Sequence, residues 1–154
     1  MIELIWSVIC ARSSIDSESN NVSLFEALEQ LNVPSDVEKQ RGPSGEQIDI
    51  LIPQTIELIS LWRLSDYKKP EKAECRVRLR TPQGIGEVSK PFMIDLSTSG
   101  LKRFRTVMKI NGIPFKGFGT YFFVVELRNE ASGTWEEKAK VPIDVEVLQE
   151  KKQS

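Results

Sequence analysis

The feature that most constrains the fold is an alternation of apolar and polar side chains with a period of two. It is most regular near the C-terminus, where one set is Ala139, Val141, Ile143, Val145 and Val147 and the other is Lys138, Lys140, Asp144 and Glu146. A period of two places successive side chains on opposite faces of an extended strand. This segment is therefore predicted to be a strand, with an edge position or a bulge at Pro142, because proline cannot donate a ladder hydrogen bond.

The same period recurs in earlier segments of the chain. Residues 74–80 place apolar side chains on one face and charged ones on the other, which is typical of an antiparallel strand with one face in water. Residues 2–10 and 56–64 are largely apolar on both faces, which predicts strands that are covered on both sides.

Turn signals separate these segments. Pro82-Gln83-Gly84 and Asn111-Gly112 are typical turn sequences, and "NEASGT" at 129–134 also predicts a turn. Short strands at this spacing predict an all-β, antiparallel sandwich or barrel.

The segment "NNVSLFEALEQLNV" supports two interpretations. Ser23 and Glu26 match a helix capping box, and leucines follow at helical spacing. The same residues also form an imperfect strand face. Because the surrounding segments are extended, we favour a strand over 22–31. The polar stretch 34–47, rich in glycine and proline, is predicted to be a loop.

The run "GTYFFVVEL" favours a particular kind of sandwich. Gly119 permits a sharp corner before Tyr121, and the pattern resembles the tyrosine corner of immunoglobulin-like domains, where the hydroxyl bonds to nearby backbone. Trp62 lies in an earlier strand that is apolar on both faces, and it resembles the core tryptophan of these domains. Cys10 and Cys75 do not match the disulfide of antibody domains. We therefore expect an immunoglobulin-like β-sandwich of about seven to nine strands.

Most of the chain also resembles a family of small bacterial proteins of unknown function that have an immunoglobulin-like sandwich. The resemblance rests on "SSIDSESNNVSLFEALEQLNVP", "ELISLWRL", "RVRLRTPQG", "RFRTVMKINGIPFKGFGTYFFVVEL" and "TWEEKAKVPIDVEV", in that order. It implies that 22–31 is a strand, and it assigns no catalytic or binding residue.

Length and charge limit the organisation and the partners. A chain of 154 residues fits one domain, here 1–148, with a flexible tail at 149–154. With 21 basic and 22 acidic residues, the net charge of −1 does not predict general attraction to nucleic acid or to a membrane. The N-terminal stretch lacks the features of a secretory signal. We expect a cytoplasmic protein in which Cys10 and Cys75 are reduced and buried.

The chain contains no histidine. This excludes Ser-His-Asp and Cys-His catalysis within the chain, and also zinc sites that need two histidines. The paired carboxylates Asp144/Glu146 and Glu136/Glu137 have no predicted apolar surroundings to raise a pKa for acid–base catalysis. We therefore expect no enzymatic activity, no cofactor and no metal.

Two strand faces are rich in basic residues and form a candidate anion-binding surface, made of Arg76, Arg78, Arg80, Arg103, Arg105 and Lys109. If the two strands are neighbours, their guanidinium groups present donors to phosphate or carboxylate, or to a nucleic acid strand stacked on Phe104 or Trp135. The alternative is a solvated sheet face with cross-strand glutamate partners.

A second candidate surface is apolar. Phe122 and Val124 fall on the outer face of their strand, so either a second chain covers them or the segments 12–21 and 34–52 do. The sequence thus predicts a non-catalytic binding or assembly module with a protein partner or a second copy of itself. Binding of an anionic ligand is the alternative, and nucleic acid is the less expected partner.

Overall fold

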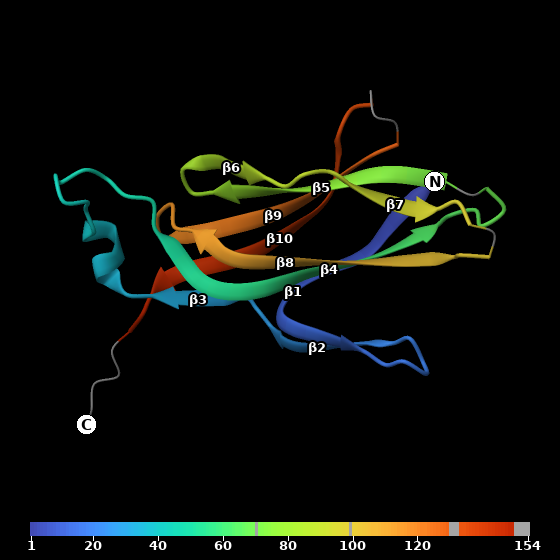
Figure 1. The fold of residues 1–154 in the computed structure, drawn as a ribbon, viewed down its shortest axis with the longest axis horizontal. Helices are drawn as coiled ribbons and strands as arrows, with labels where there is room; N and C mark the ends of the chain where they lie inside the picture. Colours follow the sequence, from blue (N-terminus) through green and yellow to red (C-terminus); the bar gives the residue numbers. More distant parts are fainter. Residues whose placement is uncertain (70, 99, 130–132, 150–154) are drawn as a thin grey trace.

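The computed structural model describes residues 1–69, 71–98, 100–129 and 133–149, and nearly all regular structure in them is β-strand. Ten strands form two sheets that pack face to face (Figure 1). The all-β prediction is confirmed, with more strands in the described residues than the seven to nine expected. None of the described residues forms an α-helix, so none provides a helix long and apolar enough to cross a membrane.

The first sheet, sheet A, has four strands. Their order across the sheet is β2 (Val22–Ala27), β1 (Ile2–Ile15), β4 (Leu51–Leu64) and β8 (Arg103–Pro114). Neighbouring strands in this sheet are antiparallel. Strand β4 is therefore central, which agrees with its apolar residues on both faces.

The second sheet, sheet B, has six strands. Five follow the order β3 (Gln30–Val33), β10 (Glu136–Val147), β9 (Gly119–Arg128), β5 (Glu71–Thr81) and β6 (Gly84–Val88), and β7 (Phe92–Leu96) pairs with another part of β5. The short β3 runs parallel to β10, whereas the other described pairs are antiparallel.

The main core lies between the two sheets and consists of their inward side chains. Trp62 and Tyr121 are its largest fully buried members, one from each sheet. The Trp62 indole N–H donates to Thr106 Oγ1 at 3.2 Å, so its polar atom is satisfied inside the sandwich.

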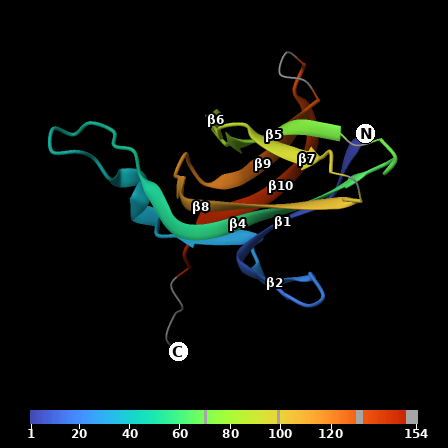
Figure 2. The same ribbon diagram turned by 45° about the vertical axis from the view of Figure 1, so that its right-hand side comes forward.

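Strand β1 changes its pairing partner near Cys10. Residues Ile2–Cys10 pair with β4, and Cys10–Ile15 pair with β2. The β1–β2 hairpin then turns back along the outer face of the sheet, as the two views together show (Figure 2). A hydrogen bond of 2.5 Å from Ser13 Oγ to Glu57 Oε2 ties the hairpin to β4.

The corner before β9 has the expected hydrogen bond. The Tyr121 hydroxyl donates to the carbonyl oxygen of Gly117 at 2.7 Å and accepts from the Lys116 N–H at 2.6 Å. Gly119 has φ +133°, a conformation that L side chains rarely adopt, so glycine is needed at this corner. One phenol thus satisfies two backbone groups where the chain enters the central strand of sheet B.

Other local predictions had mixed outcomes. The segment 22–31 is extended and not helical, as predicted, but it is divided between two strands, β2 and the start of β3, which belong to different sheets. The expected loop 34–47 contains a short 3₁₀-helix, Ser35–Lys39, whose Val37 is buried. Strand β10 pairs with β9 on one side at Pro142, and β3 pairs with its other side only from Asp144 onward. Among the described residues Pro142 therefore has an unpaired edge, as predicted.

The turn predicted at Asn111-Gly112 is wrong. Both residues lie inside β8, where the pairing with β4 shifts register between Ile52 and Thr55. Gly112 has φ +89°, and a glycine with positive φ suits a β-bulge as well as a turn. Two predictions fall on residues that the structure does not describe. These are the flexible tail at 149–154, of which only residue 149 is described, and the "NEASGT" turn, of which 130–132 are not described.

Removing the Tyr121 hydroxyl tests the role of the corner. We expect Tyr121→Phe to lower the free energy of unfolding by about 1–3 kcal/mol, because two partly buried backbone groups lose their partner. Chemical denaturation measures this change. Tyr67→Phe, at an exposed phenol, is the matched control and should leave the stability nearly unchanged. Equal stability of the two variants would contradict this role.

Candidate functional site

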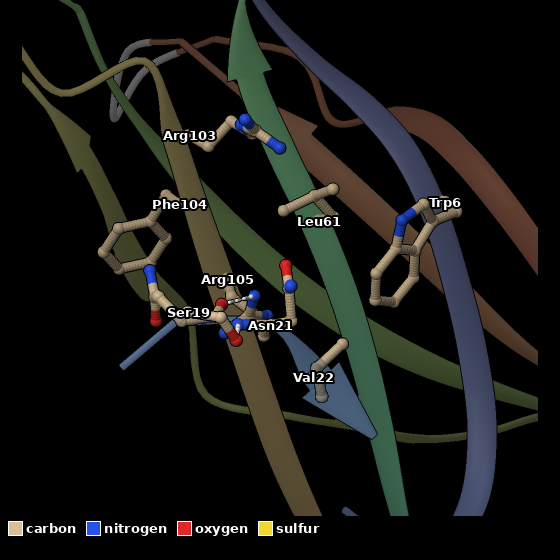
Figure 3. Close-up of a pocket in the computed structure, with 9 residues that line it drawn as sticks. Trp6, Ser19, Asn21, Val22, Leu61, Arg103, Phe104 and Arg105 are labelled. Carbon is tan, nitrogen blue, oxygen red and sulfur yellow. Dashed lines mark hydrogen bonds between the residues drawn. The ribbon is translucent and has the colours of Figure 1, made fainter. Parts of the chain in front are cut away.

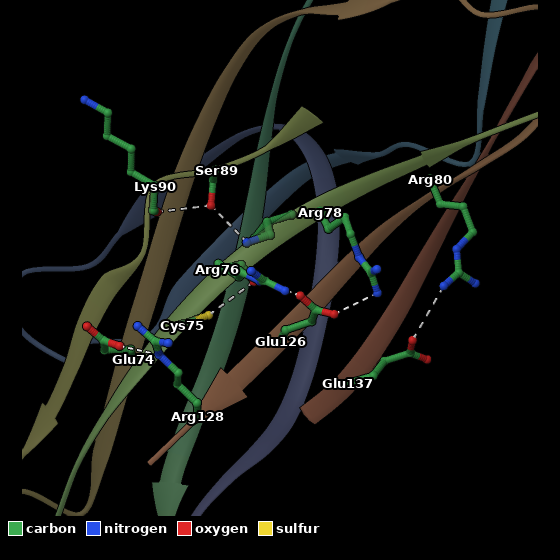
Figure 4. Close-up of polar contacts among 11 residues, drawn as sticks. Glu74, Cys75, Arg76, Arg78, Arg80, Ser89, Lys90, Glu126, Arg128 and Glu137 are labelled. Atoms are coloured by element: carbon green, nitrogen blue, oxygen red, sulfur yellow. Dashed lines mark hydrogen bonds and ion pairs between the residues drawn. The ribbon is translucent and has the colours of Figure 1, made fainter. Parts of the chain in front are cut away.

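The basic face of β5 is neutralised by carboxylates of its own sheet (Figure 4). Glu126, which is almost completely buried, accepts hydrogen bonds from Arg76 Nε at 2.6 Å and from Arg78 Nη2 at 2.7 Å. Arg80 Nη2 lies 4.0 Å from Glu137 Oε2. This is the arrangement of a charged sheet face with cross-strand partners, so little of the positive charge on β5 is free for a ligand.

Trp135 takes part in the same neutralised face. Its ring lies 4.3 Å from the guanidinium carbon of Arg76 and 4.4 Å from that of Arg128, measured to the ring centroid. Arg128 Nε also donates to Glu74 Oε2 at 2.5 Å. The ring is therefore occupied by cation–π contacts within the chain and is poorly placed to stack on a base.

The two basic strand faces are not adjacent. Strand β5 belongs to sheet B, and β8 is the last strand of sheet A. The outer faces of two packed sheets point away from each other, so the six basic residues form no single cationic stripe. The basic residues of β8 must therefore be considered separately.

Arg103 and Arg105 of β8 line a cleft of about 450 Å³ on the outer face of sheet A (Figure 3). The tip of the β1–β2 hairpin forms its opposite wall. The lining residues are Trp6, Ser19, Asn20, Asn21, Val22, Leu61, Arg103, Phe104 and Arg105. The cleft thus combines two guanidinium groups, an indole ring and two side-chain amides.

The cleft exists because the hairpin folds back. Arg105 Nη2 donates to the Asn20 carbonyl oxygen at 3.0 Å, which joins β8 to the hairpin tip across the sheet. Beneath the hairpin, Cys10 and Ile59 are fully buried although neither belongs to the core between the sheets. The hydrogen bonds from Ser13 to Glu57 and from Arg105 to Asn20 join the hairpin to sheet A, and its tip leaves a hollow beside β8.

The guanidinium groups of the cleft lack the neutralisation seen on β5. Among the described residues, neither Arg103 nor Arg105 lies within ion-pair distance of a carboxylate. Arg105 Nε is buried without a hydrogen-bond partner among the described residues, as is Arg78 Nε of β5, so the contrast between the two strands rests on the carboxylates. Arg103 also lies opposite Arg63, whose own charge pairs with Glu3 at 3.1 Å. Like charges on opposite strands are destabilising, and an anion would relieve this repulsion.

Lys109, the third basic residue of β8, lies apart from the cleft. It is exposed, and its neighbour across the sheet is Glu57. The structure therefore brings Arg103 and Arg105 together and separates them from Lys109 and from the β5 arginines.

Of the two apolar candidates of β9, Val124 is covered within the chain and Phe122 is covered only in part. Val124 is fully buried, and Phe122 is half-buried. Val124 lies between Arg78 and Lys140 on the neighbouring strands, and the aliphatic stems of such side chains cover apolar surface well. The segments 12–21 and 34–52 are not needed as a cover, and Val124 presents no surface to a partner.

Both cysteines are free and buried, as expected, and the surroundings of each suppress its ionisation. Burial raises the pKa of the Cys75 thiol to about 12. Burial, and then the nearby carboxylate of Glu57, raise the pKa of Cys10. No group of three metal-binding side chains occurs among the described residues.

Sequence reasoning missed half of the cleft. It selected Arg103 and Arg105 but not Trp6, Asn20 or Asn21, which lie far away along the chain. Residues 2–10 are apolar on both faces of their strand, which predicted that another segment covers the outer face of sheet A. No local pattern signalled that the hairpin following it would do so.

No protein-family model matches this chain, and no curated protein is significantly similar to it.

Replacing Glu126 tests the neutralised face. We expect Glu126→Gln to lower the free energy of unfolding by about 1–3 kcal/mol, because two charge-assisted hydrogen bonds in a mostly buried setting are weakened. Glu146→Gln, an exposed carboxylate on β10, is the control and should behave like wild type in the same denaturation experiment. A stability loss no larger than that of the control would show that the Glu126 contacts contribute little.

The raised pKa values predict inert thiols. At pH 8 the native protein should react with Ellman's reagent far more slowly than the protein unfolded in guanidinium, because both thiols are buried and protonated. Two equivalents should react after unfolding. Rapid labelling of either cysteine in the native protein would contradict the burial.

Proposed function

We propose that the protein is a non-catalytic binding module of the cytoplasm and that it holds a small anionic ligand in the cleft between β8 and the hairpin tip. One observation carries this proposal. Arg103 and Arg105 lie together in a hollow without carboxylate partners among the described residues, whereas the arginines of β5 have such partners. Charge left unpaired in a hollow favours a ligand of opposite sign.

The size of the cleft favours a small molecule over a polymer. About 450 Å³ lies within the range of sites for small ligands. The Trp6 indole offers a flat apolar surface, and the Asn21 amide offers hydrogen bonds at the hairpin. A ligand with a phosphate or carboxylate attached to an aromatic ring matches these groups best.

An immunoglobulin-like fold is part of the proposal. In such sandwiches one sheet contains strands A, B and E and the other contains C, F and G. Here β1, β4 and β8 are neighbours in one sheet, and β5, β9 and β10 are neighbours in the other. Taken in chain order, these six strands alternate between the two sheets as strands A, B, C, E, F and G do. The Tyr121 hydrogen bonds at the start of β9 support the same assignment. Similarity to small bacterial proteins of this fold stays a prediction.

Binding of a simple aromatic anion tests the proposed site. We expect phenyl phosphate to change the Trp6 fluorescence in a saturable way, and Arg105→Ala to weaken this binding roughly tenfold through loss of a charge-assisted contact. Trp6→Phe should remove most of the signal, although Trp62 and Trp135 remain. Phenol, which lacks the charge, should bind much more weakly.

Lys109→Ala is the matched control, since it removes a positive charge from the same strand outside the cleft. It should leave the affinity for phenyl phosphate within about twofold of wild type. No saturable binding, or equal loss with both variants, would overturn the proposed site. Tighter, salt-dependent binding of a single-stranded oligonucleotide would favour a nucleic acid ligand instead.

A further inference from the structure

Strand β8 has one free edge. It pairs with β4 from Arg103 to Pro114, and no other described strand pairs with its second edge in sheet A. An unpaired edge presents a row of backbone N–H and C=O groups, which can bind an additional strand. At 12 residues, β8 is long for an edge strand.

An apolar groove lies beneath this free edge, on the open side of the sandwich. It has a volume of about 140 Å³, and its walls come from both sheets. The apolar side chains that line it are Val77, Leu79, Val88, Met108, Ile110, Ile113, Pro114 and Phe123. Val88 is 46% exposed, so part of this surface is in contact with water.

The groove continues into a second hollow along the same edge. This hollow, of about 340 Å³, shares Leu79, Glu87 and Pro114 with the first and extends to Ile50 and Leu51. Leu51 is 60% exposed. Two adjacent hollows beside a free edge suit an extended segment, because alternate side chains of a strand point to the same side.

Charge argues against a second copy of this chain as the occupant. The outward side chains of β8 near its middle are Arg105, Val107 and Lys109. If two β8 strands paired about a two-fold axis at Val107, Arg105 of each copy would lie opposite Lys109 of the other. Like charges directly opposite are destabilising, and lysine on an edge is a known means of preventing self-association.

The same charges favour an acidic occupant. A strand added beside β8 would point alternate side chains into the groove and the others outward, beside Arg105 and Lys109. The inward positions need apolar residues, and the outward positions are complementary to aspartate or glutamate.

We propose that the free edge of β8 binds an extended segment of another protein in which apolar and acidic residues alternate. The segment adds a strand to sheet A, fills the two hollows with its apolar side chains and pairs its carboxylates with Arg105 and Lys109. The groove and Lys109 lie outside the ligand cleft, whereas Arg105 also lines that cleft. The proposal extends the proposed function to binding of a protein partner.

A fluorescein-labelled octapeptide of alternating valine and glutamate is the probe. We expect it to bind the full chain in an anisotropy titration, and we expect the peptide with lysine in place of glutamate to bind at least roughly tenfold more weakly. Lys109→Glu should reverse this preference. Arg12→Glu makes the same charge change at the far side of sheet A and should keep the preference for glutamate.

Backbone methylation separates strand addition from simple charge attraction. In an added strand, alternate N–H groups face β8 and the others face solvent. Two peptides, N-methylated at odd or at even positions, should therefore differ, with one losing binding and the other retaining it. Equal binding of the two methylated peptides would overturn strand addition, and so would absence of binding by the glutamate peptide.

Lys109 distinguishes these outcomes from those at the ligand cleft, because Arg105 belongs to both surfaces and Lys109 does not line the cleft. Phenyl phosphate binding reports on the cleft whether or not the octapeptide binds, and Lys109→Glu lies outside the cleft lining. Reversible dimerisation of the wild-type chain that Lys109→Glu alters, measured by sedimentation, would also overturn the proposal, because the edge would then bind a second copy.

Discussion

The hydrogen bonds that join the β1–β2 hairpin to sheet A, from Ser13 to Glu57 and from Arg105 to Asn20, are the contacts on which the cleft depends. Cys10 and Ile59 point away from the main core and are nevertheless inaccessible to water. Full burial of one side chain such as Ile59 contributes roughly 1.5–3 kcal/mol relative to exposure. The side chains of β2 are mostly exposed, so Ser13 ties the base of the hairpin to Glu57, and the tip extends toward β8, where the Asn20 carbonyl accepts a hydrogen bond from Arg105.

The chain contains two sets of arginines whose surroundings differ because their strands differ. Strand β5 has β9 beside it, and β9 supplies Glu126 between Arg76 and Arg78. Strand β8 lies at the margin of sheet A, and its neighbour β4 offers Arg63 opposite Arg103. Position in the sheet therefore decides which arginines are neutralised and which retain charge for a ligand or for a partner.

The margin of sheet A also accounts for both proposed surfaces. One side of β8 contributes to the cleft through outward side chains near its start, and its free edge lies above the groove further along. The first surface needs the hairpin, whereas the second needs only the open side of the sandwich. The two proposed surfaces share Arg105, whereas Trp6 and Asn21 belong only to the cleft and Met108 and Ile110 only to the groove.

The period-two pattern predicted the strands well, because burial of alternate side chains is a local property of the sequence. It also identified Tyr121 and its corner. The pattern failed at Asn111-Gly112, because a glycine with positive φ serves a bulge and a turn equally. The partner of Arg76 and Arg78 was not predictable, since Glu126 lies about 50 residues away and only the pairing of β5 with β9 brings it near. The hairpin wall of the cleft was missed for the same reason.

The central claim is that Arg103 and Arg105, and not the β5 arginines, bind an anion. The most direct measurement is the NMR spectrum of the arginine Nε–Hε groups during titration with phenyl phosphate. We expect the resonances of Arg103 and Arg105 to shift together and saturate, while those of Arg76 and Arg78 stay unchanged because Glu126 binds both side chains. Shifts confined to the β5 arginines, or no shift at any arginine, would contradict it.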